Sequence, residues 1–275
     1  MSFGPPLSEA DVAPFDNGVV PRYLSFFTSI SVGMLLPFSP SRIAHVGCRV
    51  GYPHLEMAER FPECEIVGWD ASSAAIELAK SRADGVPNAS LTYEVGEGIP
   101  PSIEPGSFTH AIAIHPFGGP EERAKLLSDL HRLLLPGGQA VIALPVRGSF
   151  PEVNDMLREF ALRQDLPDLG KAVDTAITNR PTIETLSEEM ENAGFTDTDT
   201  DVSLIAISFD SGRDLVEDPI WRLMVLTDMA AILPTDAPLV STAFRYAEDA
   251  IQKYWSEGVL ELTINVGCAS GRKPA

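Results

Sequence analysis

The residues best suited to bind a ligand lie in one short turn in the first half of the chain. Residues 43–46 are mostly apolar and predict a strand, which runs into a segment with glycine at both ends, Gly47 to Gly51. Glycine lets the backbone approach a ligand closely, and the helix expected next offers free amides at its start. Asp70 lies 19 residues beyond Gly51, at the expected end of the next strand, where a carboxylate can accept both hydroxyls of a ribose. The spacing predicts a cleft for an adenosine-bearing ligand.

Histidines are the other candidates for chemistry. His115 follows an apolar run and precedes Pro116-Phe117, at the expected tip of a strand. Because histidine titrates near neutrality, it is a candidate general base, with a buried structural role as the alternative. His45 is predicted to be a core residue, and His54, beside the turn, is a candidate ligand contact. No histidines are four residues apart and the three cysteines show no C-x-x-C spacing, so we expect no metal site.

The elements that must position these residues alternate between strand and helix. Strands are expected at 43–46, 64–69, 91–95, 111–114 and 140–144, with helices between them. This order predicts a parallel sheet with right-handed crossovers. The second half is less regular: helices are expected at 151–163, 182–192, 212–232 and 237–255, and strands at 202–209 and 260–266.

We expect a single domain over residues 1–275. Its parts would be an irregular lead-in to residue 20 and a helix over 22–36 (together 1–40), a core over 41–210, a helical insertion over 211–258, and a last strand with a tail over 259–275.

Composition limits the partners. The formal net charge is −19 and no cluster of Lys and Arg interrupts it, which argues against a nucleic-acid partner. Apolar runs are far shorter than the ~20 residues that cross a bilayer, and the start of the sequence shows no secretory pattern, so we expect a cytoplasmic location and no membrane contact. The sequence does not set the oligomeric state.

Several segments, in this order, resemble the class I S-adenosylmethionine-dependent methyltransferases, especially the small-molecule type. The glycine turn is similar to their first motif, and the end of the second strand is similar too. Further likenesses lie before and after the third to sixth strands. The segments are His45-Val46-Gly47-Cys48-Arg49-Val50-Gly51, Val67-Gly68-Trp69-Asp70, Val95-Gly96-Glu97-Gly98, Pro105-Gly106-Ser107-Phe108, Leu133-Leu134-Leu135-Pro136-Gly137-Gly138 and Glu191-Asn192-Ala193-Gly194-Phe195.

The resemblance implies an α/β fold: a Rossmann-like, doubly wound sheet of seven strands with strand seven antiparallel, an N-terminal helix and a helical cap. It also implies S-adenosyl-L-methionine as cofactor and a small-molecule methyl acceptor as partner. By that resemblance the turn would hold the methionine part, Asp70 the ribose and Glu97 with Gly98 the adenine, while Tyr23 or Arg22 would reach the methionine carboxylate. The cofactor-binding residues expected are Tyr23, Gly47, Cys48, Arg49, Gly51, Asp70, Ala71, Glu97, Gly98 and His115, and His115 is the expected catalytic residue.

Two positions depart from the family pattern. His45 stands where the family usually has an acid, and Arg49 stands where it usually has glycine. Arg49 could bind the cofactor carboxylate, point outward or fill the pocket. Two alternatives to an active methyltransferase therefore stay open: a degenerate relative that serves as a binding or scaffold protein, and an NAD(P)-dependent oxidoreductase built on the same kind of sheet.

Overall fold

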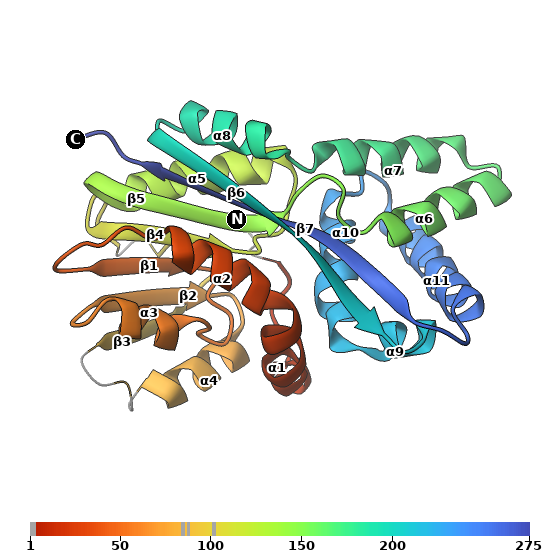
Figure 1. Ribbon diagram of the computed structural model, residues 1–275, viewed down its shortest axis with the longest axis horizontal. Coiled ribbons are helices and arrows are strands. Elements are labelled where there is room, and N and C mark those ends of the chain that lie inside the picture. The colour runs from red at the N-terminus through yellow and green to blue at the C-terminus, as the bar shows by residue number, and fades with distance from the viewer. Residues whose placement is uncertain (1–3, 84–85, 87–88, 101–102) are drawn as a thin grey trace.

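The computed structural model describes residues 4–83, 86, 89–100 and 103–275, so the first three residues of the expected lead-in lie outside it. Seven strands form one sheet in the order β3-β2-β1-β4-β5-β7-β6 (Figure 1). The strands β1 to β5 pair in parallel, and β7 is antiparallel to both of its neighbours. The predicted fold class is confirmed. The bounds are β1 Arg42–Val46, β2 Glu65–Asp70, β3 Ser90–Val95, β4 Phe108–Ile114, β5 Leu134–Pro145, β6 Thr196–Phe209 and β7 Leu260–Arg272.

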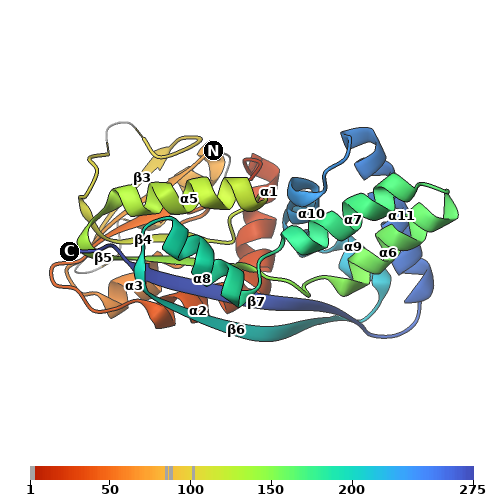
Figure 2. The same cartoon turned by 90° about the horizontal axis from the view of Figure 1, so that it is seen from above.

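Helices cover both faces of this sheet (Figure 2). On one face lie α2 (Ser25–Met34), α3 (His54–Arg60) and α4 (Ser73–Ala83), which share a hydrophobic cluster. On the other face, α5 (Pro120–Leu133) and α8 (Ile183–Asn192) pack over a second cluster. The central strands are almost wholly buried because they are covered on both sides.

The N-terminal region differs from the prediction of an irregular lead-in. Helix α1 (Glu9–Pro14) continues through a wide π-helical segment, η1 (Phe15–Leu24), into α2. The buried side chains of η1 lie about one helical turn apart, first Phe15, then the pair Val19 and Val20, then the pair Tyr23 and Leu24. That apolar stripe against the core outweighs the helix-breaking tendency of Gly18 and Pro21.

The second half builds a mostly helical end of the molecule, seen at the right of Figure 1. It contains α6 (Pro151–Arg163), α7 (Pro167–Asn179), α9 (Gly212–Glu217), the short segment η2 (Trp221–Val225), α10 (Leu226–Ile232) and α11 (Ala237–Tyr254). The sequence did not predict α7, and the single helix expected over 212–232 is broken into three. The division of the chain into a core and a helical insertion stays a prediction.

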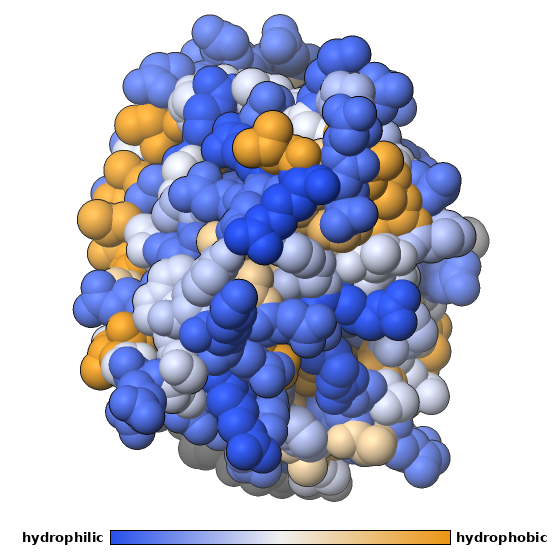
Figure 3. Space-filling view, turned by 90° about the vertical axis from the view of Figure 1, so that its right-hand side faces the viewer, coloured by the Kyte–Doolittle hydropathy of each residue, from blue (hydrophilic) through white to orange (hydrophobic). Residues whose placement is uncertain are grey.

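The surface of this helical end is mainly hydrophilic, with apolar residues in small separate patches (Figure 3). Within the described ranges, no helix has the length and apolar content needed to span a bilayer.

Candidate functional site

The glycine turn has the backbone geometry that its sequence predicts. The amides of Gly47 and Cys48 both donate to the carbonyl of Trp69, at 2.9 and 3.1 Å, which holds the turn against the end of β2. Gly47 and Gly51 have φ angles of 72° and 78°, in the left-handed region that glycine adopts without strain. A side chain at Gly51 would come within 2.9 Å of the Tyr93 hydroxyl. Glycine is therefore required at this point.

Asp70 ends β2 beside this turn, and its carboxylate is fully buried. One oxygen, Oδ1, accepts from the Ser72 amide at 2.9 Å, and the other, Oδ2, accepts from the Arg49 amide at 3.2 Å. The Arg49 Nε lies 3.8 Å from the same Oδ2. The acid that was predicted to hold a ribose is thus engaged by the chain itself.

The segment Gly4 to Leu7, which we call the N-terminal strap, covers Asp70 together with Arg49. Arg49 Nη1 donates to the Pro5 carbonyl at 3.0 Å, and Ser72 Oγ donates to the Leu7 carbonyl at 2.7 Å. The Arg49 guanidinium also lies 5.4 Å from the centre of the Phe117 ring. In this arrangement the site does not fit a nucleoside. Arg49 and the N-terminal strap occupy the space beside Asp70, and the hydrogen-bond donors of Arg49 and Ser72 are already used by the strap carbonyls.

The other residues expected around the cofactor gather at the same edge of the sheet. Ala71 is half-buried next to Asp70. The Gly96 amide donates to the Asp70 carbonyl at 2.9 Å, which brings the loop after β3 alongside β2. In that loop Glu97 is exposed and Gly98 has open space around it. The structure therefore brings together the positions expected for the ribose and the adenine, with the adenine side the more open.

Beneath the turn lies a buried chain of polar groups that the sequence did not reveal. His45 Nδ1 and His54 Nε2 are 2.8 Å apart, and His54 Nδ1 is 2.7 Å from the Tyr93 hydroxyl. Burial lowers the pKa of His45 to about 3, and burial followed by the neighbouring His45 lowers the pKa of His54 well below its ordinary value. His54 was a candidate ligand contact, but it lies in the interior and bonds to His45 and Tyr93. His45 is a core residue, as predicted.

His115 lies at the end of β4 in a buried aromatic surround. Its Nε2 is 2.8 Å from the hydroxyl of Tyr23, and the rings of Phe27 and Phe117 lie 5.0 Å from its own ring. Its Nδ1 is buried and finds no partner among the residues described. Burial lowers the pKa of His115 to about 4, an effect that nearby Asp228 partly opposes. Tyr23, expected at the cofactor carboxylate, is fully buried and bonds to His115.

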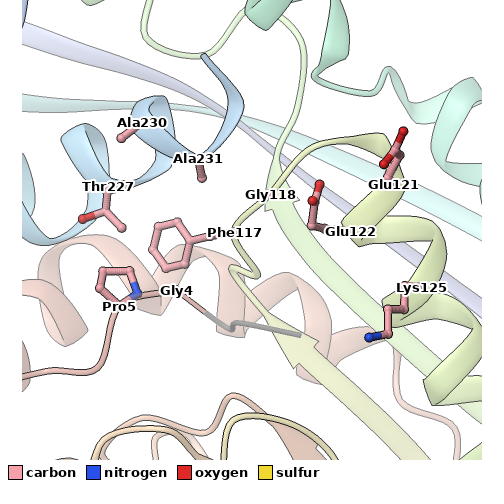
Figure 4. Close-up of a pocket in the computed structure, with 10 residues that line it drawn as sticks. All are labelled: Gly4, Pro5, Phe117, Gly118, Glu121, Glu122, Lys125, Thr227, Ala230 and Ala231. Atoms are coloured by element: carbon pink, nitrogen blue, oxygen red, sulfur yellow. The ribbon is translucent and has the colours of Figure 1, made fainter. Parts of the chain in front are cut away.

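A cavity of about 730 Å³ opens beside this region, between the end of β4 and α10 (Figure 4). Phe117 both lines the cavity and contacts the His115 ring, while His115 does not line it. The first two turns of α5 and one side of α10 form opposite walls. The lining residues are Gly4, Pro5, Phe117, Gly118, Glu121, Glu122, Lys125, Thr227, Ala230 and Ala231.

Residues 43–138 match the model of a methyltransferase domain family. The chain is 27% identical over 135 residues to a demethylmenaquinone methyltransferase of Deinococcus radiodurans, covering 45% of this chain and 56% of that protein. It is 27% identical over 150 residues to a trans-aconitate 2-methyltransferase of an Acidovorax species, covering 54% and 55%. The chain thus spans about half the length of the curated relatives it matches.

Among solved structures, the chain is similar to phosphoethanolamine N-methyltransferase 2 of Haemonchus contortus in complex with S-adenosyl-L-methionine. The TM-score is 0.58 and the sequence identity is 16%, and the match covers 98% of this chain and 58% of that one. It is also similar to the YcgJ protein of Bacillus subtilis, with a TM-score of 0.56 and 15% identity over 91% and 99%. At such low identity these likenesses concern the fold, and they agree with the strand order. The match to the methyltransferase domain model covers residues 43–138, from β1 into the start of β5, and together with the strand order it supports the resemblance of this chain to the class I S-adenosylmethionine-dependent methyltransferases.

Proposed function

We propose that the protein transfers a methyl group from S-adenosylmethionine to a small molecule held in the cavity between β4 and α10. The observation that carries this proposal is the position of the cavity at the end of β4, where two of its lining residues, Phe117 and Pro5, contact Arg49 of the glycine turn. Its volume of about 730 Å³ lies within the usual range of small-molecule sites, roughly 300–1,000 Å³. The names of the matched relatives, which refer to trans-aconitate and demethylmenaquinone, support a small-molecule acceptor. The family match favours this activity over an oxidoreductase.

The protein's own contribution to such a transfer is mainly alignment of the acceptor, because displacement at a sulfonium methyl is an in-line reaction. Phe117 and the alanines of α10 offer an apolar wall, and Glu121 with Lys125 offers polar contacts. The catalytic role of His115 stays a prediction. A histidine whose pKa is about 4 is neutral at pH 7 and takes up a proton weakly, so hydrogen bonding suits it better than proton abstraction.

One observation supports a second candidate, a binding or scaffold protein that does not use the cofactor. Arg49 and the strap fill the nucleoside site, and Arg49 has a φ of 49° where glycine would be unstrained. The methyltransferase proposal requires that both groups move when the cofactor binds. The expected cytoplasmic location stays a prediction.

Calorimetric titration of the full chain with S-adenosylmethionine separates the two candidates. We expect saturable binding that Asp70→Asn weakens about tenfold or more, since the ribose hydroxyls then lose a charged acceptor. Glu65→Gln is the matched control, because Glu65 begins the same strand at its opposite end and pairs with Arg42. Saturable binding that Asp70→Asn leaves unchanged would contradict the proposed ribose contact. A complete absence of binding would favour the scaffold candidate.

A further inference from the structure

The N-terminal strap makes contacts that a surface tail would not make. Two of its carbonyls accept hydrogen bonds from side chains of the nucleoside site, Arg49 and Ser72. Because proline has no amide hydrogen, Pro5 and Pro6 can be held only through their carbonyls and rings. Leu7 is 8% exposed and belongs to the main hydrophobic cluster. The strap is thus anchored at both ends over the buried Asp70.

Gly4 packs closely against the same site. Its φ is 103°, and a Cβ added there would lie 2.4 Å from the Phe117 ring and 2.6 Å from Arg49 Nη2. Figure 4 shows Gly4 and Pro5 beside Phe117. A side chain at Gly4 would therefore force the strap away from the site while leaving every residue of the turn unchanged.

We propose that the strap, latched by Arg49, is an internal occupant of the nucleoside site and competes with the nucleoside for it. Arg49 supplies Asp70 with a positive partner, and Ser72, beside Asp70, is occupied by a strap carbonyl. The nucleoside and the strap cannot both lie over Asp70. This inference rests on the proposed cofactor, and it makes binding a balance between a latched and a released chain.

Two variants release the strap by different routes. Gly4→Val displaces it by steric clash, and Arg49→Gly removes the latch and relieves the left-handed backbone. Glu63→Gly is the matched control for the second variant, because Glu63 also has a positive φ, 63°, and precedes β2 at the end of that strand far from Asp70. Each full-length chain is titrated with S-adenosylmethionine by calorimetry. Hydrogen exchange is then followed by mass spectrometry over residues 4–12 and 47–53, with and without the ligand.

We expect Gly4→Val and Arg49→Gly to bind S-adenosylmethionine about tenfold more tightly than the natural chain, because a site that is free in only a small fraction of molecules binds with proportionally lower affinity. Glu63→Gly should leave the affinity unchanged. In the natural chain, saturating ligand should speed exchange over residues 4–12 and slow it over 47–53.

Unchanged or weaker binding by both variants would overturn the proposal. Slower exchange over residues 4–12 with ligand would also overturn it, because the strap would then be part of the bound form. Equal affinity in all chains would remove the strap proposal alone and leave the proposed function intact. An absence of binding in every chain, with exchange over 4–12 already fast in Gly4→Val, would overturn both.

Discussion

Arg180 and Asp228 form a buried ion pair behind His115, with side chains that are 4% and 5% exposed. Arg180 Nη2 also contacts Met229 Sδ at 3.3 Å, and its guanidinium lies 5.0 Å from the centre of the Phe150 ring. Asp228 raises and Arg180 lowers the pKa of His115, so the pair acts electrostatically on the candidate site without touching the cavity. Its two charges depend on each other because both are almost wholly shielded from water.

Removing one member of this pair should therefore be costly. We expect Asp228→Asn to lower the free energy of unfolding by about 3–5 kcal/mol, since it leaves the Arg180 charge buried without its partner. The double variant Arg180→Met/Asp228→Leu should recover most of that loss. Urea unfolding measures both. Asp168→Asn is the control, because its pair with Lys171 is exposed and should contribute at most about 1 kcal/mol. An equally small effect at Asp228 would show that the buried charge of Arg180 does not need this partner.

At the scale of elements, the helical end is held together by close crossings. Gly212 begins α9, and its amide donates to the Trp255 carbonyl at 2.8 Å, at the end of α11. A Cβ at Gly212 would lie 2.2 Å from the Ile251 carbonyl oxygen, which belongs to the α11 backbone and cannot rotate away. The contact between α9 and α11 therefore depends on a residue without a side chain.

We expect Gly212→Ala to lower the free energy of unfolding by about 1–3 kcal/mol, the usual cost of overpacking. Gly33→Ala is the matched control, because Gly33 lies in α2 with nothing within 4 Å of an added Cβ. That control should raise stability by about 0.5–1 kcal/mol, the helix advantage of alanine over glycine. Thermal and urea unfolding of the two variants should shift in opposite directions. Unchanged or raised stability in Gly212→Ala would show that α9 moves aside without cost.

Elements whose burial is visible in their own residues could be predicted from the sequence. The apolar runs of β1 and β4 are examples, and so is the apolar stripe of α5. The first six residues of β6 could not be predicted as strand. Thr196 to Asp201 alternates threonine and aspartate, and most of these side chains are exposed. That segment is a strand because β7 pairs with it, for instance Thr200 with Ala269. Such pairing is decided by tertiary structure and not by local composition.

The same distinction applies to the candidate site. The glycine turn and the place of Asp70 at the end of β2 could be predicted, because the glycines and the strand end have a characteristic spacing in one stretch of sequence. The strap over Asp70 could not, because Leu7 and Ser72 are 65 residues apart. The chain His45–His54–Tyr93 had no signal beyond isolated histidines. The departure at Arg49 was visible, but only the structure shows its guanidinium between Asp70 and Pro5.

Taken as a whole molecule, the protein keeps its histidines neutral. All five have lowered pKa values with burial as the first cause, and those of His45 and His115 fall to about 3 and 4. In the unfolded chain a histidine titrates near pH 6.5. Below that pH the unfolded state binds protons that the folded state does not bind. The contribution of the buried neutral histidines to the free energy of unfolding is therefore fully present above about pH 6.5 and is lost as the solution is acidified.

Each fully buried histidine should lower the free energy of unfolding by about 1.4 kcal/mol for every unit by which the pH falls, between its pKa in the unfolded chain and its lower pKa in the folded protein. We therefore expect His45→Gln to reduce the slope of stability against pH by about that amount between pH 6 and pH 4.5, whatever its effect on stability at pH 7. Ser31→Ala, at another buried position that does not titrate, should shift stability without changing the slope. Urea unfolding at several pH values measures both quantities. An unchanged slope in His45→Gln would mean that His45 is protonated in the folded protein. Burial opposes that state, and so does His54, because two charged rings with nitrogens 2.8 Å apart would repel each other.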